Sequence, residues 1–254
     1  MVLLGSKDPA PFSIFNADSS SNLLFTSDHN GSAIPTKLKN LGVPLNELRR
    51  HVAYDIGIDA VAHALSARFN ATLIVANYSR LVIDCNRHPG SAGSIPSVSD
   101  NTVVPGNKNL SDDDIKFRED EIFDAYHSSV GNRISIMRSE NKNPILISLH
   151  SFTPVIGGQF RPWEIGILFK DDERLSAPLI NKLREQKDLN IGDNKPYSGS
   201  EPAGYTVDYH VEPLSLPSVA VEFRQDLIEF ESGAVRWANI FGDALDHVLT
   251  AKIR

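Results

Sequence analysis

Cysteine is almost missing from this chain of 254 residues, which contains only Cys85. A single cysteine excludes an intrachain disulfide and a zinc site built from several thiolates, so a bound zinc would need histidine and carboxylate ligands. The sequence also lacks a run of about 20 apolar residues, the length that a membrane-spanning helix requires. Residues 1–18 show no charged start followed by an apolar core, so we expect no secretory signal and a cytoplasmic location.

Positive charge is also in the minority. The chain has 25 Lys and Arg residues against 32 Asp and Glu residues, which gives a formal net charge of −7. This acidic balance argues against nucleic acid or an anionic membrane as a partner. A small acidic substrate remains compatible with it, because a nearby arginine outweighs a distant surface charge. Hydrophobic residues make up 41% of the chain, as in an ordinary globular protein, and we expect one domain spanning residues 1–254.

Strand-like and helix-like segments alternate along the whole chain. Short β-branched or apolar runs predict strands at residues 23–26, 72–76, 81–85, 144–149, 163–169 and 217–223. Helical spacing of apolar residues predicts helices at 45–69 (in two segments), 174–186 and 233–252. Ser111 followed by three aspartates predicts a capped helix running to about residue 140, with the acidic run as a cap and not a metal cluster. This alternation predicts a three-layer α/β/α sandwich.

Two strand-like runs each lead to a histidine, His29 in the first and His150 in the second. Because parallel strands present ligands at their carboxyl ends, the two imidazoles are placed to share one metal ion; either one alone also fits a buried, hydrogen-bonded histidine. A catalytic zinc takes three protein ligands, and the common His-x-x-Glu signature is absent because Ser32 stands three residues after His29. Asp55, in a turn-like break of a helical region, is our candidate third ligand, with a surface or capping aspartate as the alternative.

Glu222 lies inside the apolar run of residues 219–223. Carboxylates are rarely buried without a partner, and burial raises the pKa of a carboxyl group toward neutrality. Such a group suits the role of a general base that takes a proton from water. The alternative is an ion pair between Glu222 and Arg224 or another arginine.

Residues 79–87 combine two arginines with an asparagine and an aspartate. Arg80 is suited to polarise a carbonyl oxygen, and Asn86 with Arg87 is suited to bind a carboxylate through an amide and a guanidinium fork. Asp84 is expected to orient an arginine, and a purely structural salt-bridge network is the alternative for all of these charged residues. Cys85, with no neighbouring histidine closer than His88, fits a small core residue better than a nucleophile.

A second polar loop, residues 194–199, contains Tyr197, Ser198 and Gly199. Loops between rigid elements often line binding pockets, so these residues are candidates for substrate contact; a simple turn is the alternative. His210 is a further candidate with little specific support in the sequence.

Five of these segments together resemble the N-formylglutamate amidohydrolase family, in the order in which that family carries them: residues 27–31, 78–87, 149–151, 194–199 and 221–223. The resemblance implies a zinc-carboxypeptidase-like α/β/α fold with a mixed central sheet. It also implies hydrolysis of an N-acyl amide on an acidic amino acid, such as N-formylglutamate, with zinc or another divalent metal as the cofactor.

The resemblance also implies residue roles. His29 and His150 would bind the metal, with Asp55 as the third ligand by approximate position. Glu222 would activate water and Arg80 would stabilise the oxyanion. Asn86 and Arg87 would hold the substrate carboxylate. A zinc carboxypeptidase, an aspartoacylase-like deacylase and a non-catalytic binder of an acidic metabolite are the alternative functions.

Overall fold

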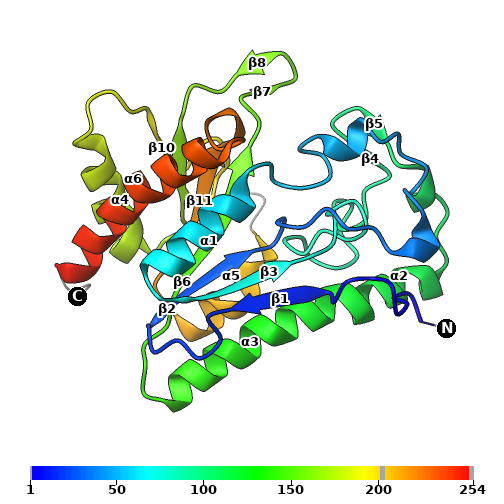
Figure 1. Ribbon diagram of the computed structural model, residues 1–254, viewed down its shortest axis with the longest axis horizontal. Helices are drawn as coiled ribbons and strands as arrows, with labels where there is room; N and C mark the ends of the chain where they lie inside the picture. The colour runs from blue at the N-terminus through cyan, green and yellow to red at the C-terminus, as the bar shows by residue number, and fades with distance from the viewer. Residues whose placement is uncertain (1, 201–203, 252–254) are drawn as a thin grey trace.

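The computed structural model describes residues 2–200 and 204–251, and within them seven strands form one sheet in the order β1-β3-β2-β6-β11-β9-β10 (Figure 1). The strands are β1 Phe12–Phe15, β2 Leu23–Ser27, β3 Thr72–Ala76, β6 Ile145–Phe152, β9 Ile165–Leu168, β10 Ile191–Asp193 and β11 Ser218–Arg224. The pairs β3–β2, β2–β6, β6–β11 and β9–β10 are parallel, whereas β1–β3 and β11–β9 are antiparallel. The mixed central sheet is therefore confirmed.

Helices cover both faces of this sheet and confirm the three-layer α/β/α sandwich (Figure 1). One face packs against α1 (Ile58–Arg68), α4 (Glu173–Arg184) and α6 (Glu231–Thr250). The other faces α2 (Asp112–Arg118), α3 (Asp124–Ser139) and the short α5 (Tyr205–His210), with a π-helical turn, Glu119–Phe123, joining α2 to α3. None of the helices in the described residues is long and apolar enough to cross a membrane.

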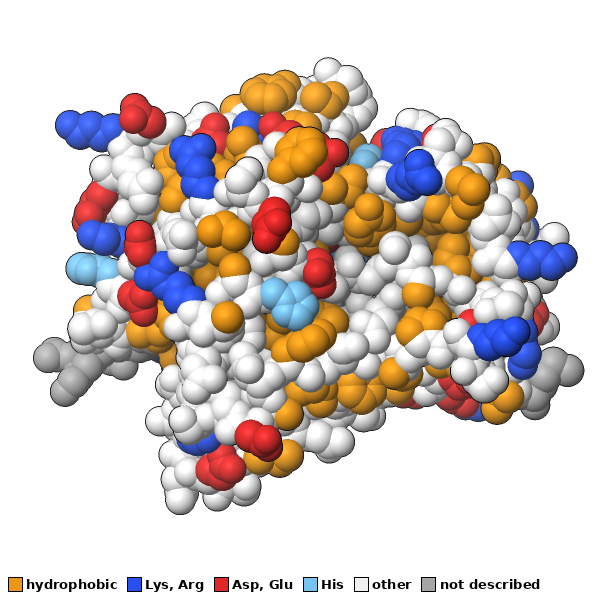
Figure 2. All heavy atoms as spheres, viewed as in Figure 1, with side chains coloured by type: hydrophobic (Ala, Val, Ile, Leu, Met, Phe, Trp, Pro, Cys, Tyr) orange, Lys and Arg blue, Asp and Glu red, His pale blue; other side chains and the backbone are white. Residues whose placement is uncertain are grey.

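The remaining elements are short and lie outside the sheet. Two hairpins are formed by β4 (Val98–Ser99) with β5 (Thr102–Val103) and by β7 (Val155–Ile156) with β8 (Gln159–Phe160). Five 3₁₀ turns within the described residues cover Thr36–Leu38, Glu47–Arg49, Pro105–Asn107, Glu212–Leu214 and Gln225–Leu227. On the surface shown in Figure 2, basic side chains are scattered among acidic ones and form no single positive patch.

Near the carboxyl ends of the central strands, alternation separates apolar side chains on one face from polar ones on the other. Leu149, Val221 and Phe223 point into the core beneath α1, α4 and α6. The residues between them, His150 and Glu222, point to the opposite face and are register partners on β6 and β11. Because side chains alternate with a period of two, the apolar residues that hold the strands in place also fix the direction of the polar ones.

The predicted strand at residues 81–85 is wrong. Its side chains are buried, but its backbone forms turns: Val82 N–H donates to the Ser79 carbonyl at 2.8 Å and Asp84 N–H to the Ser94 carbonyl at 2.7 Å. An apolar run predicts that a segment is buried, but burial alone does not distinguish a strand from a buried turn. The turn brings Arg80 back to Asp84, where the two side chains form an ion pair of 2.8 Å.

The first helical segment predicted within residues 45–69 is also wrong, because only the 3₁₀ turn Glu47–Arg49 and irregular turns precede α1. Asp55 N–H donates to the carbonyl of His29 at 2.9 Å, a partner outside any helix. Tertiary hydrogen bonds have therefore replaced helical ones here. The second segment is confirmed as α1, and the predicted start of α2 is confirmed by a capping box between Ser111 and Asp114. The short elements β1, β10 and α5 were not predicted.

A buried histidine pair joins α3 to α5, with His127 Nδ1 3.1 Å from His210 Nε2. His210 is 5% exposed and does not line the cavity described below. Burial first, and then the neighbouring His127, lower the pKa of His210 from 6.5 to about 4, against the opposing effect of Asp28. His210 is therefore a neutral packing residue, and its role as a site candidate is not supported by its position.

This lowered pKa predicts a pH-dependent stability. The unfolded chain binds a proton at His210 below its ordinary pKa of 6.5, whereas the folded chain resists it down to about 4, so His210 favours folding above that window and the benefit is lost as the pH falls through it. We expect His210→Gln to reduce the change in unfolding free energy between pH about 7.5 and about 4 by about 3 kcal/mol. Denaturant unfolding of the wild-type and variant proteins at both pH values measures this change in unfolding free energy. The exposed His247→Gln is the control, and an equal pH dependence in all three proteins would contradict the assignment.

Candidate metal centre and catalytic site

The functional side chains meet near the carboxyl ends of β2, β6 and β11. His29 follows β2 by two residues, while His150 and Glu222 lie side by side on β6 and β11. β2 and β11 are both parallel neighbours of β6, so all three strands end at the same edge of the sheet. Asp55 and Arg80 reach this edge from the turns on either side of α1 and β3.

The carboxylate of Asp55 lies between the two histidines. Its Oδ2 atom is 3.2 Å from Nδ1 of His150 and 3.6 Å from Nδ1 of His29. One ligand atom from each of the three buried residues lies within 4.8 Å of the others. The structure thus brings together the three residues that the sequence suggested as metal ligands, including the third, whose placement rested on approximate position.

Local backbone contacts hold Asp55 in this position. Its own N–H bonds to the His29 carbonyl, and the N–H of Ser151 donates to Asp55 Oδ2 at 3.1 Å. Gly57, two residues later, has a φ of +80°, and a Cβ atom there would lie 2.3 Å from the carbonyl oxygen of Ile228. Only glycine fits this turn, which carries the chain from the site directly into α1.

Each histidine has a second acidic neighbour on its far side. His29 Nε2 lies 2.7 Å from Asp84 Oδ1, and His150 Nε2 lies 2.9 Å from Ser148 Oγ and 3.5 Å from Asp28 Oδ2. Metal-binding histidines commonly donate their other ring N–H to a carboxylate or another acceptor, which directs the free nitrogen at the metal. Here the arrangement directs both Nδ1 atoms toward Asp55.

Asp28, which the sequence analysis did not single out, is a buried partner of His150. Tyr126 and Thr206 donate to Asp28 Oδ1 at 2.6 and 2.9 Å. Burial raises the pKa of Asp28, but the contact with His150, the charge of His29 and the hydrogen bond from Tyr126 outweigh it and lower the pKa to about 2. The adjacency of Asp28 to His29 in sequence was a visible signal, but its partner on β6 was not.

The donor set fits a divalent metal. Among the described residues, His29 Nδ1 is buried without a hydrogen-bond partner, as is Glu222 Oε2. Burial would lower the pKa of His150, yet Asp28 and Asp55 raise it to about 10, so the site strongly favours a positive charge. Two imidazole nitrogens and a carboxylate oxygen are the ligands that zinc accepts in catalytic sites.

Glu222 is buried beside this centre and has no ion-pair partner within residues 2–200 and 204–251. Arg224, the alternative partner, binds Asp226 at 2.9 Å instead. Burial raises the pKa of Glu222, the positive charge of His150 opposes it, and the result is a pKa of about 7. A carboxyl group with this pKa can both accept and return a proton near neutral pH.

Arg80 belongs to a salt-bridge network and to the site at once. Its guanidinium binds Asp84 at 2.8 Å and lies 3.5 Å from Asp55 Oδ1, while a quarter of its side chain remains exposed to the cavity. Burial would lower its pKa, but Asp84 and Asp55 raise it, so the guanidinium stays charged. Asp84 orients Arg80, as expected, and holds His29 as well.

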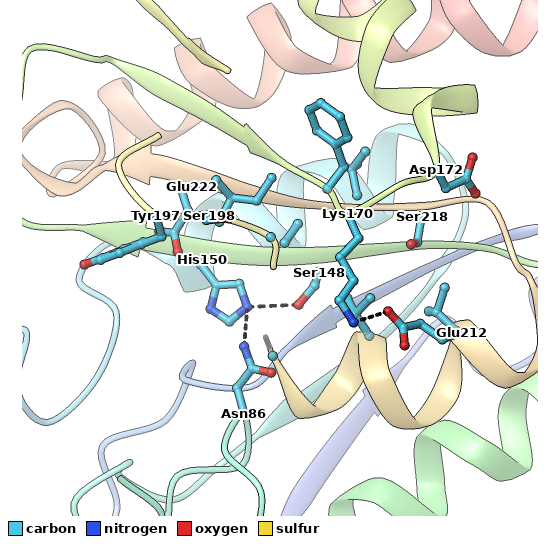
Figure 3. Close-up of a pocket in the computed structure, with 18 of the residues that line it drawn as sticks. Asn86, Ser148, His150, Lys170, Asp172, Tyr197, Ser198, Glu212, Ser218 and Glu222 are labelled. Carbon is cyan, nitrogen blue, oxygen red and sulfur yellow. Dashed lines mark hydrogen bonds and ion pairs between the residues drawn. The ribbon is translucent and has the colours of Figure 1, made fainter. Parts of the chain in front are cut away.

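A cavity of about 660 Å³ opens beside these groups, and the predicted substrate-binding residues Asn86, Arg87, Tyr197, Ser198 and Gly199 all line it. Figure 3 shows Asn86, Tyr197 and Ser198 around His150. The amide of Asn86 lies 3.5 Å from His150 Nε2 and accepts the N–H of Thr206 at 3.3 Å.

Two neighbours of these residues complete the description. Buried Arg161, which sequence reasoning did not single out, donates to the Tyr197 hydroxyl at 2.9 Å and so holds that ring at the cavity wall. Cys85 does not line the cavity, and burial raises the pKa of its thiol, which confirms its interpretation as a core residue.

The fold and the site define a three-layer α/β/α protein with a buried His-Asp-His group that could hold a metal ion at the carboxyl ends of its central strands. A family model described as N-formylglutamate amidohydrolase matches residues 21–229. The chain belongs to the N-formylglutamate amidohydrolase family, as the resemblance of its motifs predicted.

The solved structures that are similar to this chain include the following two. The gene product Atu2144 of Agrobacterium tumefaciens is 31% identical over 98% of each chain, with a TM-score of 0.95. The N-formylglutamate amidohydrolase of Ralstonia eutropha JMP134 is 19% identical, covers 95% of this chain and 98% of its own, and shares the fold with a TM-score of 0.72. A comparison with curated proteins finds no match.

Removing the central carboxylate tests the metal centre. We expect Asp55→Asn to weaken zinc binding by at least about 100-fold, because it removes one of three ligands and the charge between two histidines. Titration calorimetry on chelator-treated protein measures the affinity and the stoichiometry. Asp188→Asn, at an exposed position, is the matched control. An unchanged Kd in Asp55→Asn would show that zinc binds elsewhere.

Proposed function

We propose that this protein hydrolyses the N-acyl amide of an acidic amino acid, with N-formylglutamate as the compound that its family name indicates, and that it does so with a divalent metal held by His29, Asp55 and His150. The observation that carries the proposal is the position of Glu222. This buried, unpaired carboxyl group with a pKa of about 7 is the register neighbour of His150.

Glu222 supplies the proton transfers. A divalent ion bound at the three ligands would supply Lewis acidity, which lowers the pKa of water and polarises a carbonyl group. Glu222 takes a proton from the attacking water while the water oxygen forms a bond to the acyl carbon. It then returns that proton to the nitrogen as the C–N bond breaks, so that a carboxylic acid and a free amine leave.

Arg80 stabilises the charge that develops on the acyl oxygen. Its guanidinium is fixed by Asp84 before substrate arrives and still faces the cavity. A preorganised donor of this kind needs no rearrangement during the reaction, which is why such groups contribute strongly to catalysis.

Arg87 and Asn86 bind the substrate carboxylate. Arg87 has no carboxylate partner among the described residues, and its Nη1 donates only to the carbonyl of Asn86 at 3.0 Å. The remaining donors of its fork are available for a carboxylate, which guanidinium binds with two parallel hydrogen bonds. Tyr197, Ser198 and Gly199 form the wall around this end of the cavity.

Glu222→Gln tests the general base. The substitution keeps the size of the side chain but removes its ability to accept a proton, so we expect kcat to fall by about 10²- to 10⁴-fold with unchanged metal content. Steady-state kinetics with N-formylglutamate and metal analysis of the same preparation measure both. The exposed Glu229→Gln is the control, and undiminished turnover in Glu222→Gln would remove this residue from the mechanism.

Arg87→Gln tests the carboxylate contact. Loss of a hydrogen bond between charged groups costs about 1.5–3 kcal/mol, so we expect KM to rise by roughly 10- to 100-fold while kcat changes less. The exposed Arg236→Gln removes the same charge far from the cavity and should leave KM unchanged. Equal KM values for both variants would mean that another group holds the carboxylate.

A further inference from the structure

The cavity extends well beyond the metal centre. It is lined by Glu222 at one end of β11 and by Ser218 at the other, four residues earlier on the same strand. At a rise of about 3.3 Å per residue, this distance is about 13 Å. We call this extension the apolar arm; it is lined by Leu168, Val207, Val211, Leu216, Ser218 and Ala220.

Small side chains on the sheet make room for the arm. Ala220 and Ser218 point to the same face as Glu222, because they are two and four residues away on one strand. Ala220 is partly exposed although β11 lies inside the sheet between β6 and β9. Its exposed surface therefore faces the cavity and not a packed layer.

The walls of the arm are aliphatic. Leu168 comes from β9, Val207 from α5, and Val211 and Leu216 from the turns that follow α5. A floor of small residues and walls of branched aliphatic ones match a flexible hydrocarbon group, which gains free energy in proportion to the apolar surface removed from water.

The two cations that line the cavity near the arm, Lys170 and Arg174, are already paired with carboxylates. Lys170 Nζ binds Glu212 at 2.6 Å and Asp208 at 3.4 Å, so that its methylene chain borders the cavity (Figure 3). Arg174 is paired in the same way with Asp172. Among the described Lys and Arg residues that line the cavity, Arg87 lacks a carboxylate partner, and it follows Asn86, whose amide lies 3.5 Å from His150 Nε2.

We infer that the apolar arm binds an alkyl acyl chain longer than formyl, so that the preferred substrates are N-acyl acidic amino acids with medium-length acyl groups. The inference rests on the proposed function and specifies its substrate class. The carboxylate of the amino acid lies at Arg87, the amide at the metal centre, and the acyl chain along β11. A formyl group has no carbon beyond its carbonyl and leaves this arm unused.

A series of N-acylglutamates tests the inference on the zinc-loaded enzyme. We expect kcat/KM to rise about fourfold for each added methylene from N-acetyl through N-butyryl to N-hexanoylglutamate. N-formylglutamate should have the lowest kcat/KM of the series. A flat or falling series with measurable turnover of N-formylglutamate would overturn the inference and leave the proposed function standing.

Two variants test whether the arm causes the preference for longer acyl chains. Ala220→Leu fills the floor of the arm and Val207→Phe fills its wall, so we expect each to reduce the preference for hexanoyl over formyl by at least about tenfold. Ala67→Leu makes the first change at an exposed position of α1 and is the matched control. An unchanged preference in both folded cavity variants, checked by circular dichroism, would place the acyl chain elsewhere.

Binding separates failure of the inference from failure of the proposed function. If no N-acylglutamate is hydrolysed, the proposed function is wrong. Calorimetry on the metal-free protein still tests whether the arm binds an acyl chain, because N-hexanoylglutamate must then bind at least tenfold more tightly than N-formylglutamate. In a second series, N-formyl amino acids carry apolar side chains of increasing length. This series tests the opposite orientation, in which the amino-acid side chain and not the acyl chain lies in the arm. A chain-length gain in that series alone would assign the arm to the amino acid and overturn the inference.

Discussion

The contact of one carboxylate with two imidazoles organises this site. Asp55 can lie between His29 and His150 only because its backbone N–H bonds to His29 and its side chain accepts the N–H of Ser151, contacts that connect the turn before α1 to β2 and β6. The glycine after this turn, the outer carboxylates and the position of Arg80 all follow from keeping that one group in place. Without it, the two buried histidines would lose the carboxylate that they share, and only the outer carboxylates of Asp84 and Asp28 would compensate their charge.

One face of the central strands packs the aliphatic core, and the other face carries the side chains of the candidate site. Residues facing α1, α4 and α6 form a continuous aliphatic layer, and burial of this layer stabilises the strands. Residues one position away on the same strands, such as His150, Glu222 and Ala220, face the cavity. A register shift by one residue would turn the polar set toward the helices α1, α4 and α6 and the apolar set toward the cavity, so core packing holds the candidate site groups in position.

Most polar groups at the site have hydrogen-bond or ion-pair partners, and some of these partners are shared. Asp84 serves both His29 and Arg80, and Asp28 serves His150 while it accepts hydrogen bonds from Tyr126 and Thr206. Such sharing matters because each buried charge loses its hydration and must be compensated within the protein. Glu222 is the exception: it is buried with no ion-pair partner in the described part of the chain, and burial raises its pKa.

The sequence by itself determined which residues alternate, where the buried strands run and which side chains are suited to metal or carboxylate binding; His29, His150, Glu222 and Arg87 were all identified this way. It misassigned residues 81–85 and the start of 45–69, because apolar composition reports burial and not backbone hydrogen bonding. Only the tertiary structure brought Asp55 to the histidines, paired Asp28 with His150 and opened the apolar arm along β11. The physical reason is that these features depend on distances between strands and turns far apart in the chain, which local periodicity does not contain.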